Sequence, residues 1–540
     1  MKKYIFLSII PLSFLFSLFL AQPCQAGEYY VTPDGSGSKT GANWANAWSP
    51  SDIAWASLDS AENTIYFDGG PSGVSYGHIG IGHDSDNSLY IRPGSYSPHP
   101  SGHSGPVTIT TASDGANTCI STAHGYEIAR NVTLSGETSA GAGTRNITIG
   151  PCGGEGIYNA NYRMNGNKYL YLEIKETGTC YYGSNPPTCA PNIGSQMHAI
   201  TADGNNDDIE VGYCYIHDTW VKGIKLNGAT SGYGDIKIHH NTIRATSDDA
   251  IVCASGCDID NNIVDGSNAP SYSGHPDALQ ADSRYIENIR IRNNEFRHYT
   301  QLLFFEADCM YQPDCSIRNI LIANNVFEDR LKSPNLTFPG ITLKTKGNGT
   351  NPGTWDNIII ANNTFVDLQM APIGMGHTNS TTGLTTITNS KIVNNVMTGT
   401  STNVSVFDNT GGAQMSPYSV TDTGMVFDYN LMYNGTAFDF WYNNGASFRF
   451  NYSPYTSFSD PNWLTDHPTF THGSNAAPLF VNPLAYNYHL ATSNPGLNLS
   501  SYFTADKDGV TRSEFTKGAY EYVQGGDTTA PAAPTGLVVR

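Results

Sequence analysis

The chain has 540 residues, more than the roughly 250–300 at which one globular core stops growing, so it forms several domains or one elongated repeat architecture. Only 14% of its residues are charged, and it contains 55 glycines and 32 tyrosines, which excludes a coiled coil and a charge-rich disordered chain. The formal net charge of −19 argues against non-specific binding to nucleic acid or to an anionic membrane.

The start of the chain, residues 1–26, has the layout of a secretory signal peptide. Lys2 and Lys3 precede an apolar run from Ile5 to Leu20, and a small-residue site ending at Ala26 follows, so we expect cleavage after Ala26. The apolar run is short for a membrane span, although an uncleaved anchor stays open, and no later stretch is long enough to be one. We therefore expect a secreted or cell-surface protein without a membrane span. We also expect the protein to be a monomer.

One short phrase recurs along the middle of the chain. Its pattern is apolar-x-apolar-x-x-Asn-x-apolar, as in IKIHHNTI from Ile236 and IIIANNTF from Ile358. The alternation with period two predicts a strand with one buried face, and the irregular spacing between copies predicts surface loops between units. The sixth position of the successive copies is Cys214, Asn241, Asn262, Asn294, Asn325, Asn363, Asn395 and Asn430.

A recurring Asn after a strand has a physical reason. Asn tolerates the left-handed backbone region, and its amide can bond to the next Asn when coils stack about 4.8 Å apart. Such a ladder requires equivalent residues in register, which a parallel β-solenoid provides and antiparallel hairpins do not need. The sequence therefore predicts an all-β solenoid of three-strand coils with an Asn ladder.

A second phrase precedes these copies, as in Lys222-Gly-Ile-Lys-Leu-Asn227 and Asp277-Ala-Leu-Gln-Ala-Asp282. Its third and fifth positions are apolar or small and should point inward, whereas its first, fourth and sixth positions should point outward. Stacking of the coils would align these outward positions into columns on one surface. The first-position column is His198, Lys222, Asp249, Asp277 and Gln301; the fourth position includes Lys225 and Gln280; the sixth includes Asp203, Asp282, Glu306 and Lys344.

The two phrases resemble the coils of right-handed parallel β-helix proteins of the pectate-lyase-like superfamily. The resemblance runs from Tyr29 to Tyr522 and is strongest from Tyr169 to Met432. It implies a substrate groove along the sheet that the second phrase forms. Helical spacing from Ser49 to Ala61 predicts a helix that caps the N-terminal end. The expected organisation is a signal peptide 1–26, a cap and first coils 27–160, a central β-helix 161–440, C-terminal coils and cap 441–524, and a Pro/Thr-rich tail 525–540.

Export of the chain would permit disulfides. The cysteines fit no zinc pattern, because their spacing gives no paired CxxC units, and we expect Cys214 to be a buried thiol. The close pairs are Cys180 with Cys189, Cys253 with Cys257 and Cys309 with Cys315, and a weaker pair is Cys119 with Cys152.

Asp248, Asp249 and Asp277 are the first candidates for chemistry. The run Thr246-Ser-Asp-Asp-Ala-Ile251 is similar to the paired-aspartate motif of polygalacturonase-type hydrolases, but the other motifs of that family are not found in order. Carboxylates one coil apart cannot both ionise freely, so one pKa should rise, and a protonated acid beside an ionised partner is what glycoside cleavage needs. The alternative is an ion pair of Asp249 with Lys222 one coil below.

Two further groups fit acid–base or elimination chemistry. His275, close to Asp277, is the residue type that most often transfers protons near neutral pH; the alternative is a turn-capping Asp bonded to that His. Lys222, Lys225 and Arg284 fit elimination from a uronate, which needs a base and a cation at the carboxylate; the alternative is solvated or paired surface charge. In related lyases Ca²⁺ supplies that cation, so Ca²⁺ stays open as a cofactor, with oxygens from Asp203, Asp207, Asp208, Asp249 and Asp277.

The predicted catalytic residues are Asp249, Asp277, His275, Lys222, Lys225 and Asp248, and the predicted substrate contacts are His198, Gln280, Arg284, Trp220 and Glu306. Together they favour a secreted β-helix protein that binds and cleaves a polysaccharide by lyase or glycoside hydrolase chemistry. The alternative is a non-catalytic surface or adhesion protein of the same fold, because fold alone does not imply function.

Overall fold

The structure is a computed structural model. It describes residues 26–524 except 112–117, 125–126, 160–164, 179, 182–187, 190–196, 229–234, 267–275, 310–314, 330–339, 347–352, 369–371, 379–384, 400–403, 406–419, 423–425, 434–437, 440–456, 467–468 and 470. The predicted signal peptide and the tail 525–540 lie outside the described residues. No helix within these described ranges is long and apolar enough to cross a membrane.

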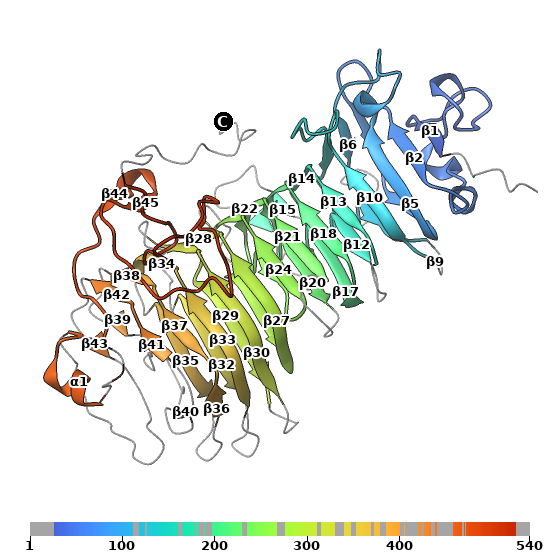
Figure 1. The fold of residues 1–540 in the computed structure, drawn as a ribbon. Coiled ribbons are helices and arrows are strands. Elements are labelled where there is room, and N and C mark those ends of the chain that lie inside the picture. The colour runs from blue at the N-terminus through green and yellow to red at the C-terminus, as the bar shows by residue number, and fades with distance from the viewer. Residues whose placement is uncertain are drawn as a thin grey trace, which may run out of the picture.

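Three long parallel sheets run along an elongated body, with the N-terminal strands at one end (Figure 1). Sheet A has 15 strands, sheet B has 12 and sheet C has 10. The chain visits the sheets in turn, so that β18 (Ile209–Gly212) lies in sheet A, β19 (Tyr215–Thr219) in sheet B and β20 (Ile224–Gly228) in sheet C. Each circuit is one coil, and the predicted right-handed parallel β-helix is confirmed.

The remaining strands of the three sheets have these bounds. Sheet A also contains β1 (Gly27–Val31), β2 (Asn63–Phe67), β5 (Asp84–Pro93), β10 (Arg130–Ser135), β13 (Lys168–Leu170), β21 (Ile236–His239), β24 (Cys257–Asp260), β27 (Tyr285–Arg292), β30 (Ser316–Ala323), β33 (Thr354–Ala361), β36 (Thr385–Thr388), β37 (Lys391–Val393), β40 (Val420–Asp422) and β41 (Val426–Asp428). Sheet B also contains β3 (Val74–Tyr76), β6 (Val107–Ile109), β11 (Ile147–Ile149), β14 (Leu172–Lys175), β22 (Thr242–Thr246), β25 (Ile263–Asp265), β28 (Glu295–Arg297), β31 (Val326–Glu328), β34 (Thr364–Leu368), β38 (Val396–Gly399) and β42 (Leu431–Tyr433). Sheet C also contains β4 (Ile79–Gly80), β7 (Ile120–Ser121), β12 (Ile157–Asn159), β17 (Ile200–Asn206), β23 (Ile251–Val252), β26 (Asp277–Ser283), β29 (Gln301–Asp308), β32 (Ile341–Lys346) and β35 (Ile373–Thr378).

Short elements complete the chain. They are the strand pairs β8 (Ala123–His124) with β9 (Glu127–Ile128), β15 (Cys180–Tyr181) with β16 (Thr188–Cys189), β39 (Val404–Ser405) with β43 (Phe438–Asp439), and β44 (Phe480–Asn482) with β45 (Asn487–Leu490). The helical turns are η1 (Trp44–Asn46), η2 (Pro50–Asp52), η3 (Trp55–Leu58), η4 (Gly94–Tyr96), α1 (Pro461–Asp466) and η6 (Pro483–Ala485).

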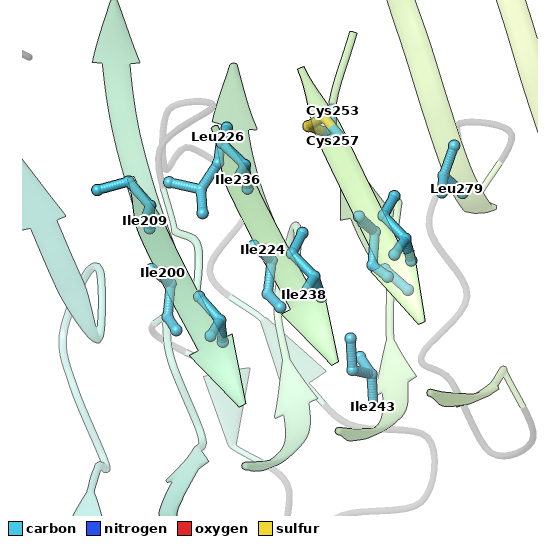
Figure 2. Close-up of a cluster of buried hydrophobic side chains, with 14 of the residues drawn as sticks. Ile200, Ile209, Ile224, Leu226, Ile236, Ile238, Ile243, Cys253, Cys257 and Leu279 are labelled. Atoms are coloured by element: carbon cyan, nitrogen blue, oxygen red, sulfur yellow. A yellow bond between two sulfur atoms is a disulfide. The ribbon is translucent and has the colours of Figure 1, made fainter. Parts of the chain in front are cut away.

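Stacked aliphatic side chains form the core inside the coils (Figure 2). On sheet C the third position of the second phrase is Ile200, Ile224, Ile251 and Leu279 on successive coils, each paired in register with the next and fully buried. Burial of one such side chain contributes about 1.5–3 kcal/mol, so the repeated inward position is what holds the coils together.

The Asn ladder lies buried at the turn between sheets A and B. Asn241 Nδ2 donates to Asn262 Oδ1 at 3.0 Å, Asn262 Nδ2 to Asn294 Oδ1 at 2.9 Å, and Asn294 Nδ2 to Asn325 Oδ1 at 3.0 Å. The series continues through Asn363 and Asn395 to Asn430. At its N-terminal end the buried thiol Cys214 takes the place of an Asn, and its backbone N–H donates to Asn241 Oδ1 at 2.9 Å.

The expected reason for the recurring Asn is partly wrong. The left-handed residue of each turn is the one before the ladder position, such as Asn261 (φ 56°) and Asn293 (φ 59°), and His240 (φ 53°) occupies it in another coil. The ladder Asn itself is selected for its amide: at Asn262, Nδ2 donates to Ile238 O of the preceding coil and to Asn294 Oδ1 of the following coil, and Oδ1 accepts from Asn241.

The prediction of a helix over residues 49–61, at the N-terminal end, is wrong in the type of helix. The segment forms the two 3-10 turns η2 and η3, of which η2 starts at a proline. The apolar spacing still has its packing consequence, because Trp55 and Leu58 are buried in the main core cluster. Its role as a cap stays a prediction.

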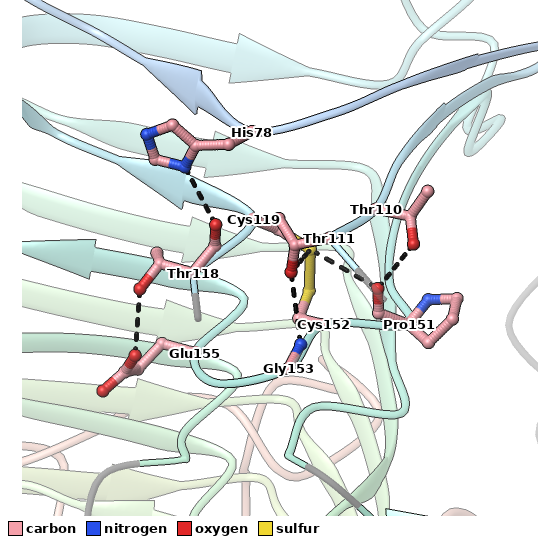
Figure 3. Close-up of a disulfide and its surroundings, with 9 residues drawn as sticks. All are labelled: His78, Thr110, Thr111, Thr118, Cys119, Pro151, Cys152, Gly153 and Glu155. Carbon is pink, nitrogen blue, oxygen red and sulfur yellow. Dashed lines mark hydrogen bonds between the residues drawn. A yellow bond between two sulfur atoms is a disulfide. The ribbon is translucent and has the colours of Figure 1, made fainter. Parts of the chain in front are cut away.

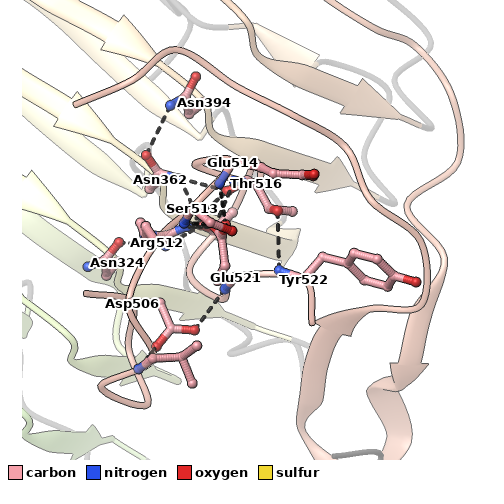
Figure 4. Close-up of polar contacts among 12 residues, drawn as sticks. Asn324, Asn362, Asn394, Asp506, Arg512, Ser513, Glu514, Thr516, Glu521 and Tyr522 are labelled. Carbon is pink, nitrogen blue, oxygen red and sulfur yellow. Dashed lines mark hydrogen bonds and ion pairs between the residues drawn. The ribbon is translucent and has the colours of Figure 1, made fainter. Parts of the chain in front are cut away.

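The last described part of the chain, residues 477–522, folds back over the outside of earlier coils, and we name it the C-terminal arm. Its Leu499, Phe503 and Phe515 pack on Leu321 and Ile359 of sheet A. Three left-handed Asn residues of the turns hold its backbone: Asn324 donates to Ala505 O at 2.9 Å, Asn362 to Thr516 O at 2.7 Å and Asn394 to Leu497 O at 2.8 Å. Figure 4 shows Arg512 within this network, where it donates to Asn324 Oδ1 at 2.7 Å.

Disulfides join Cys119 to Cys152, Cys253 to Cys257 and Cys309 to Cys315. Cys180 and Cys189 lie opposite each other in the backbone pair of β15 and β16, and their side chains lie outside the described structure. The Cys119–Cys152 bridge, the weaker of the sequence expectations, ties together the segments that enter β7 and precede β12 (Figure 3).

Candidate functional site

The outward positions of sheet C stack in register. Thr201 pairs with Lys225, Lys225 with Val252, and Val252 with Gln280, so the fourth positions form one column. The first positions follow the same order through backbone bonds from Ala199 N to Lys222 O, Gly223 N to Asp249 O and Ala250 N to Asp277 O. Lys222, Asp249 and Asp277 therefore occupy successive coils on one side of the molecule.

Lys222 lies between two carboxylates at the centre of this column. Its Nζ donates to Asp248 Oδ2 at 2.9 Å and to Asp249 Oδ2. The Asp249 side chain is 2% exposed, whereas those of Asp248 and Lys222 are 17% and 18% exposed. The pairing of Asp249 with Lys222, the alternative left open by the sequence, is thus present in the structure, and the second carboxylate makes the cluster net negative.

Burial and the neighbouring Asp248 carboxylate raise the pKa of Asp249 to about 6, and Lys222 only partly opposes them. Burial alone would lower the pKa of Lys222, but Asp249 and Asp248 outweigh it and raise that pKa. The two directions are compatible, because one ammonium faces two carboxyls: the lysine stays charged, and one carboxyl keeps a proton at mildly acidic pH.

Local structure fixes the Asp248–Asp249 turn. Thr246 Oγ1 donates to Asp248 O at 3.0 Å and lies 2.6 Å from the buried Tyr299 hydroxyl. Asp277, which is fully buried, donates its backbone N–H to Asp249 Oδ1 at 3.2 Å. A Cβ on Gly223 would lie 2.4 Å from Ala250 O, so the coil that carries Lys222 can approach the coil that carries Asp249 this closely only with glycine there.

Two residues that the sequence reasoning missed extend the first-position column. Gly156 N donates to His198 O at 2.9 Å and Cys119 N to Glu155 O at 3.0 Å, which places Glu155 and Thr118 on the two coils before His198. Thr118 Oγ1 donates to Glu155 Oε2 at 3.0 Å (Figure 3). The signal was present in Glu155-Gly-Ile-Tyr, which has the same form as Lys222-Gly-Ile-Lys. We name Thr118, Glu155, His198, Lys222, Asp249, Asp277 and Gln301 the sheet C strip.

Two members of the sheet C strip contain polar atoms without a partner in the described structure. His198 is 2% exposed and its Nδ1 has no hydrogen bond; Gln301 is 1% exposed and its Oε1 has none. Burial, with Lys225 and Lys222 close by, lowers the pKa of His198 to about 3, so its imidazole is uncharged near neutral pH.

The other predicted residues lie around the strip. Gln280 and Lys225 lie in the fourth-position column, and Glu306 pairs with Lys344, whose Nζ lies 4.4 Å from the centroid of the Phe304 ring. Arg284 lies between β26 and β27, with its guanidinium 4.9 Å from the Tyr285 ring centroid, and Trp220 lies between β19 and β20. His275 lies outside the described residues, as does the side chain of Asp203.

Those residues considered for Ca²⁺ whose side chains the structure describes do not gather into one site. Asp249 is engaged by Lys222, and Asp208 lies at the start of β18 with Lys237 of sheet A at 3.8 Å. Among the side chains that the structure describes, no group of three or more His, Cys, Asp or Glu residues could hold a metal.

No family model and no curated protein sequence matches the chain. Among solved structures, the complex of XylC with xylose is 8% identical and covers 92% of this chain and 98% of its own, with a TM-score of 0.42. Pectate lyase Pel9A is 10% identical and covers 93% and 98%, with a TM-score of 0.34. The catalytic domain of a GH87 alpha-1,3-glucanase is 12% identical with a TM-score of 0.34; the alignment covers 70% of this chain and 62% of that domain. The fold assignment itself rests on the strand registers.

Proposed function

We propose that the protein binds a polysaccharide along sheet C and hydrolyses it with the carboxyl groups of the sheet C strip and Asp248. The observation that carries the proposal is Asp249, a buried carboxyl whose pKa is raised to about 6 beside a second carboxyl and one lysine. Glycosidases use such a combination: a carboxylic acid that protonates the leaving oxygen and an ionised carboxylate that assists from the other side.

Differences in burial and neighbouring charge give these side chains different proposed roles. Asp249, which keeps its proton at mildly acidic pH, is the proposed general acid, and the more exposed Asp248 is the proposed carboxylate partner. The backbone N–H of Asp277 holds Asp249 in place, and the buried Asp277 carboxyl is proposed to take part in catalysis beside it. Lys222 keeps the turn assembled, and because its pKa is raised it is a poor base, which favours hydrolysis over elimination from a uronate.

We also propose that the protein acts outside the cytoplasm. The pattern of residues 1–26 supports export, and three disulfides are consistent with an oxidising compartment.

The test is incubation of the exported protein with neutral and uronic-acid polysaccharides, read by a reducing-end assay and by the ultraviolet absorbance of unsaturated ends. We expect reducing ends without unsaturated ends. Asp249→Asn should lower the rate by at least about 100-fold, the typical contribution of a positioned general acid, without unfolding the coil. Asp277→Asn should also abolish cleavage. Unsaturated ends would show elimination instead, and full activity in both variants would remove these residues from the mechanism.

The second candidate is a non-catalytic carbohydrate-binding or adhesion protein. The observation in its favour is that Lys222 already engages both Asp248 and Asp249, as in a purely structural cluster. This candidate predicts no product from any polymer of the panel while binding persists, and Asp249→Asn would then leave binding unchanged.

A further inference from the structure

His198 is a buried residue whose side chain is incompletely hydrogen-bonded in the described structure. Its backbone is fixed between the Glu155 and Lys222 coils, through Gly156 N to His198 O at 2.9 Å and Ala199 N to Lys222 O at 3.0 Å. Its side chain is 2% exposed, and Nδ1 has no hydrogen-bond partner among the described residues. A buried polar atom without a hydrogen bond lowers the stability of the fold by about 1–3 kcal/mol. A buried His198 beside the acidic cluster is therefore explained better by a function than by the fold.

The lysine of the strip next to His198 is already matched by carboxylates. Lys222 is engaged by Asp248 and Asp249, and farther along sheet C Lys344 is engaged by Glu306. When both carboxyls are ionised the cluster is net negative, so a uronate ligand would add a further carboxylate beside it, and the central lysine is already committed to that cluster. Repulsion between like charges at short range disfavours this ligand class.

Three uncharged polar atoms near the strip have no hydrogen-bond partner among the described residues. They are His198 Nδ1 and Gln301 Oε1 on the strip, and Ser247 Oγ next to Asp248, all on buried side chains. A neutral imidazole donates one hydrogen bond and accepts one, an amide oxygen accepts, and a hydroxyl does both. Sugar hydroxyls, which also donate and accept, are the complementary groups.

We propose that the sheet C strip takes a neutral, hydroxyl-rich glycan and that His198 is the side chain that exchanges hydrogen bonds with it next to the Lys222–Asp248–Asp249 cluster. The proposal rests on the carbohydrate-binding part of the proposed function and adds the ligand class and the contact residue. It assigns His198 to ligand binding and specificity, and leaves proton transfer to Asp249.

The experiment measures binding of the full chain to four probes by affinity electrophoresis and calorimetry: the neutral polymers xylan and α-1,3-glucan, and the anionic polymers polygalacturonate and alginate. The variants are His198→Ala and His198→Asn, the second of which keeps hydrogen-bonding capacity. The matched control is His239→Ala, an imidazole on sheet A paired with Glu210 at 3.0 Å. Thermal unfolding establishes that each variant is folded.

We expect at least one neutral polymer to bind more than about tenfold tighter than either anionic polymer. His198→Ala should weaken that binding by about tenfold or more, the size expected when a hydrogen bond inside a site is lost, with partial recovery in His198→Asn and no change in His239→Ala. Preference for an anionic polymer, no binding to any probe, or unchanged affinity in His198→Ala would overturn the proposal. If His198→Ala does not fold, the proposal is overturned when the wild type prefers an anionic polymer and His198→Asn binds with unchanged affinity.

Failure of the proposed function gives a different result. Tight, His198-dependent binding without any product would remove hydrolysis and leave this inference standing. If product forms and depends on Asp249, but the His198 variants bind with unchanged affinity, this inference is wrong and the proposed hydrolysis stands.

Discussion

The same stacking of coils builds two columns of very different character, the Asn ladder and the sheet C strip. The ladder is uniform, and each of its amides from Asn241 to Asn395 donates to the next coil within 3.1 Å. The strip changes residue type at nearly every coil, contains charges of both signs, and has buried polar atoms without a partner at His198 and Gln301.

This difference separates structural from functional repetition. A column that serves only the fold repeats one residue that satisfies its neighbours, because every coil poses the same hydrogen-bonding problem. A column whose members differ and are incompletely satisfied offers something to a ligand. We therefore expect the Asn ladder to carry stability, and the sheet C strip to carry binding and catalysis at a smaller cost in stability.

The largest effect is expected in the ladder. Asn294→Ala removes the acceptor of both Asn262 N and Asn262 Nδ2 and the donor to Asn325, and leaves buried polar groups unpaired. We expect the free energy of unfolding to fall by about 3–5 kcal/mol, since each orphaned group costs about 1–3 kcal/mol. Chemical denaturation measures it, and exposed Asn498→Ala is the control. A loss below about 1 kcal/mol would contradict the structural role of the ladder.

The next largest effect concerns the ion cluster of the strip. Lys222→Met leaves two carboxyls without their ammonium, so we expect a loss of about 3 kcal/mol at pH 8, the size seen when one partner of a buried pair is removed. The loss should be smaller at pH 5, where Asp249 can hold a proton, and Lys222→Met with Asp249→Asn should recover much of it. Lys237→Met, whose side chain is 50% exposed, is the control. An equal loss at both pH values would argue against the raised pKa of Asp249.

A smaller effect concerns pH. The pKa of Asp249 is higher in the folded state, about 6, than its ordinary value of 3.8, so the folded state holds the proton more tightly. The stability from this group is fully present below about pH 4 and is lost as pH rises through about 6, by about 2–3 kcal/mol in total. Denaturation of the wild type relative to Asp249→Asn between pH 4 and 8 should show this decline. A difference that grows with pH would contradict it.

The smallest effect is expected for the Glu306–Lys344 pair. Both side chains are partly exposed, 12% and 14%, and the pair lies at the sixth position, outside the central cluster. Glu306→Gln keeps an oxygen that can accept from Lys344 and removes one charge of a single pair, so it should cost about 1–2 kcal/mol, less than Lys222→Met, and should leave cleavage within about twofold. A large loss of activity would extend the functional column to the sixth position.

Much of the fold could be predicted from the sequence, because period-two alternation and a recurring Asn are local signals of stacked strands. The columns of sheet C followed once the register was assumed, including the pairing of Asp249 with Lys222. Glu155 and Thr118 were missed because their phrases lie far from the next copies, and the left-handed residue was misplaced by one position. C-terminal coils and a cap were expected over 441–524, but the packing of the C-terminal arm on sheet A was not foreseen, because Leu499 and Phe515 pack with residues more than a hundred positions earlier, such as Leu321.

The C-terminal arm changes how this solenoid should come apart. In a solenoid whose coils contact only their neighbours, the ends can fray one coil at a time. Here the bond from Arg512 to Asn324 spans 188 residues, and Asn362 and Asn394 are tied to the same segment. Opening of these coils requires prior release of the arm, so their amides should exchange with solvent hydrogen as one cooperative unit and not in sequence from the C-terminal end.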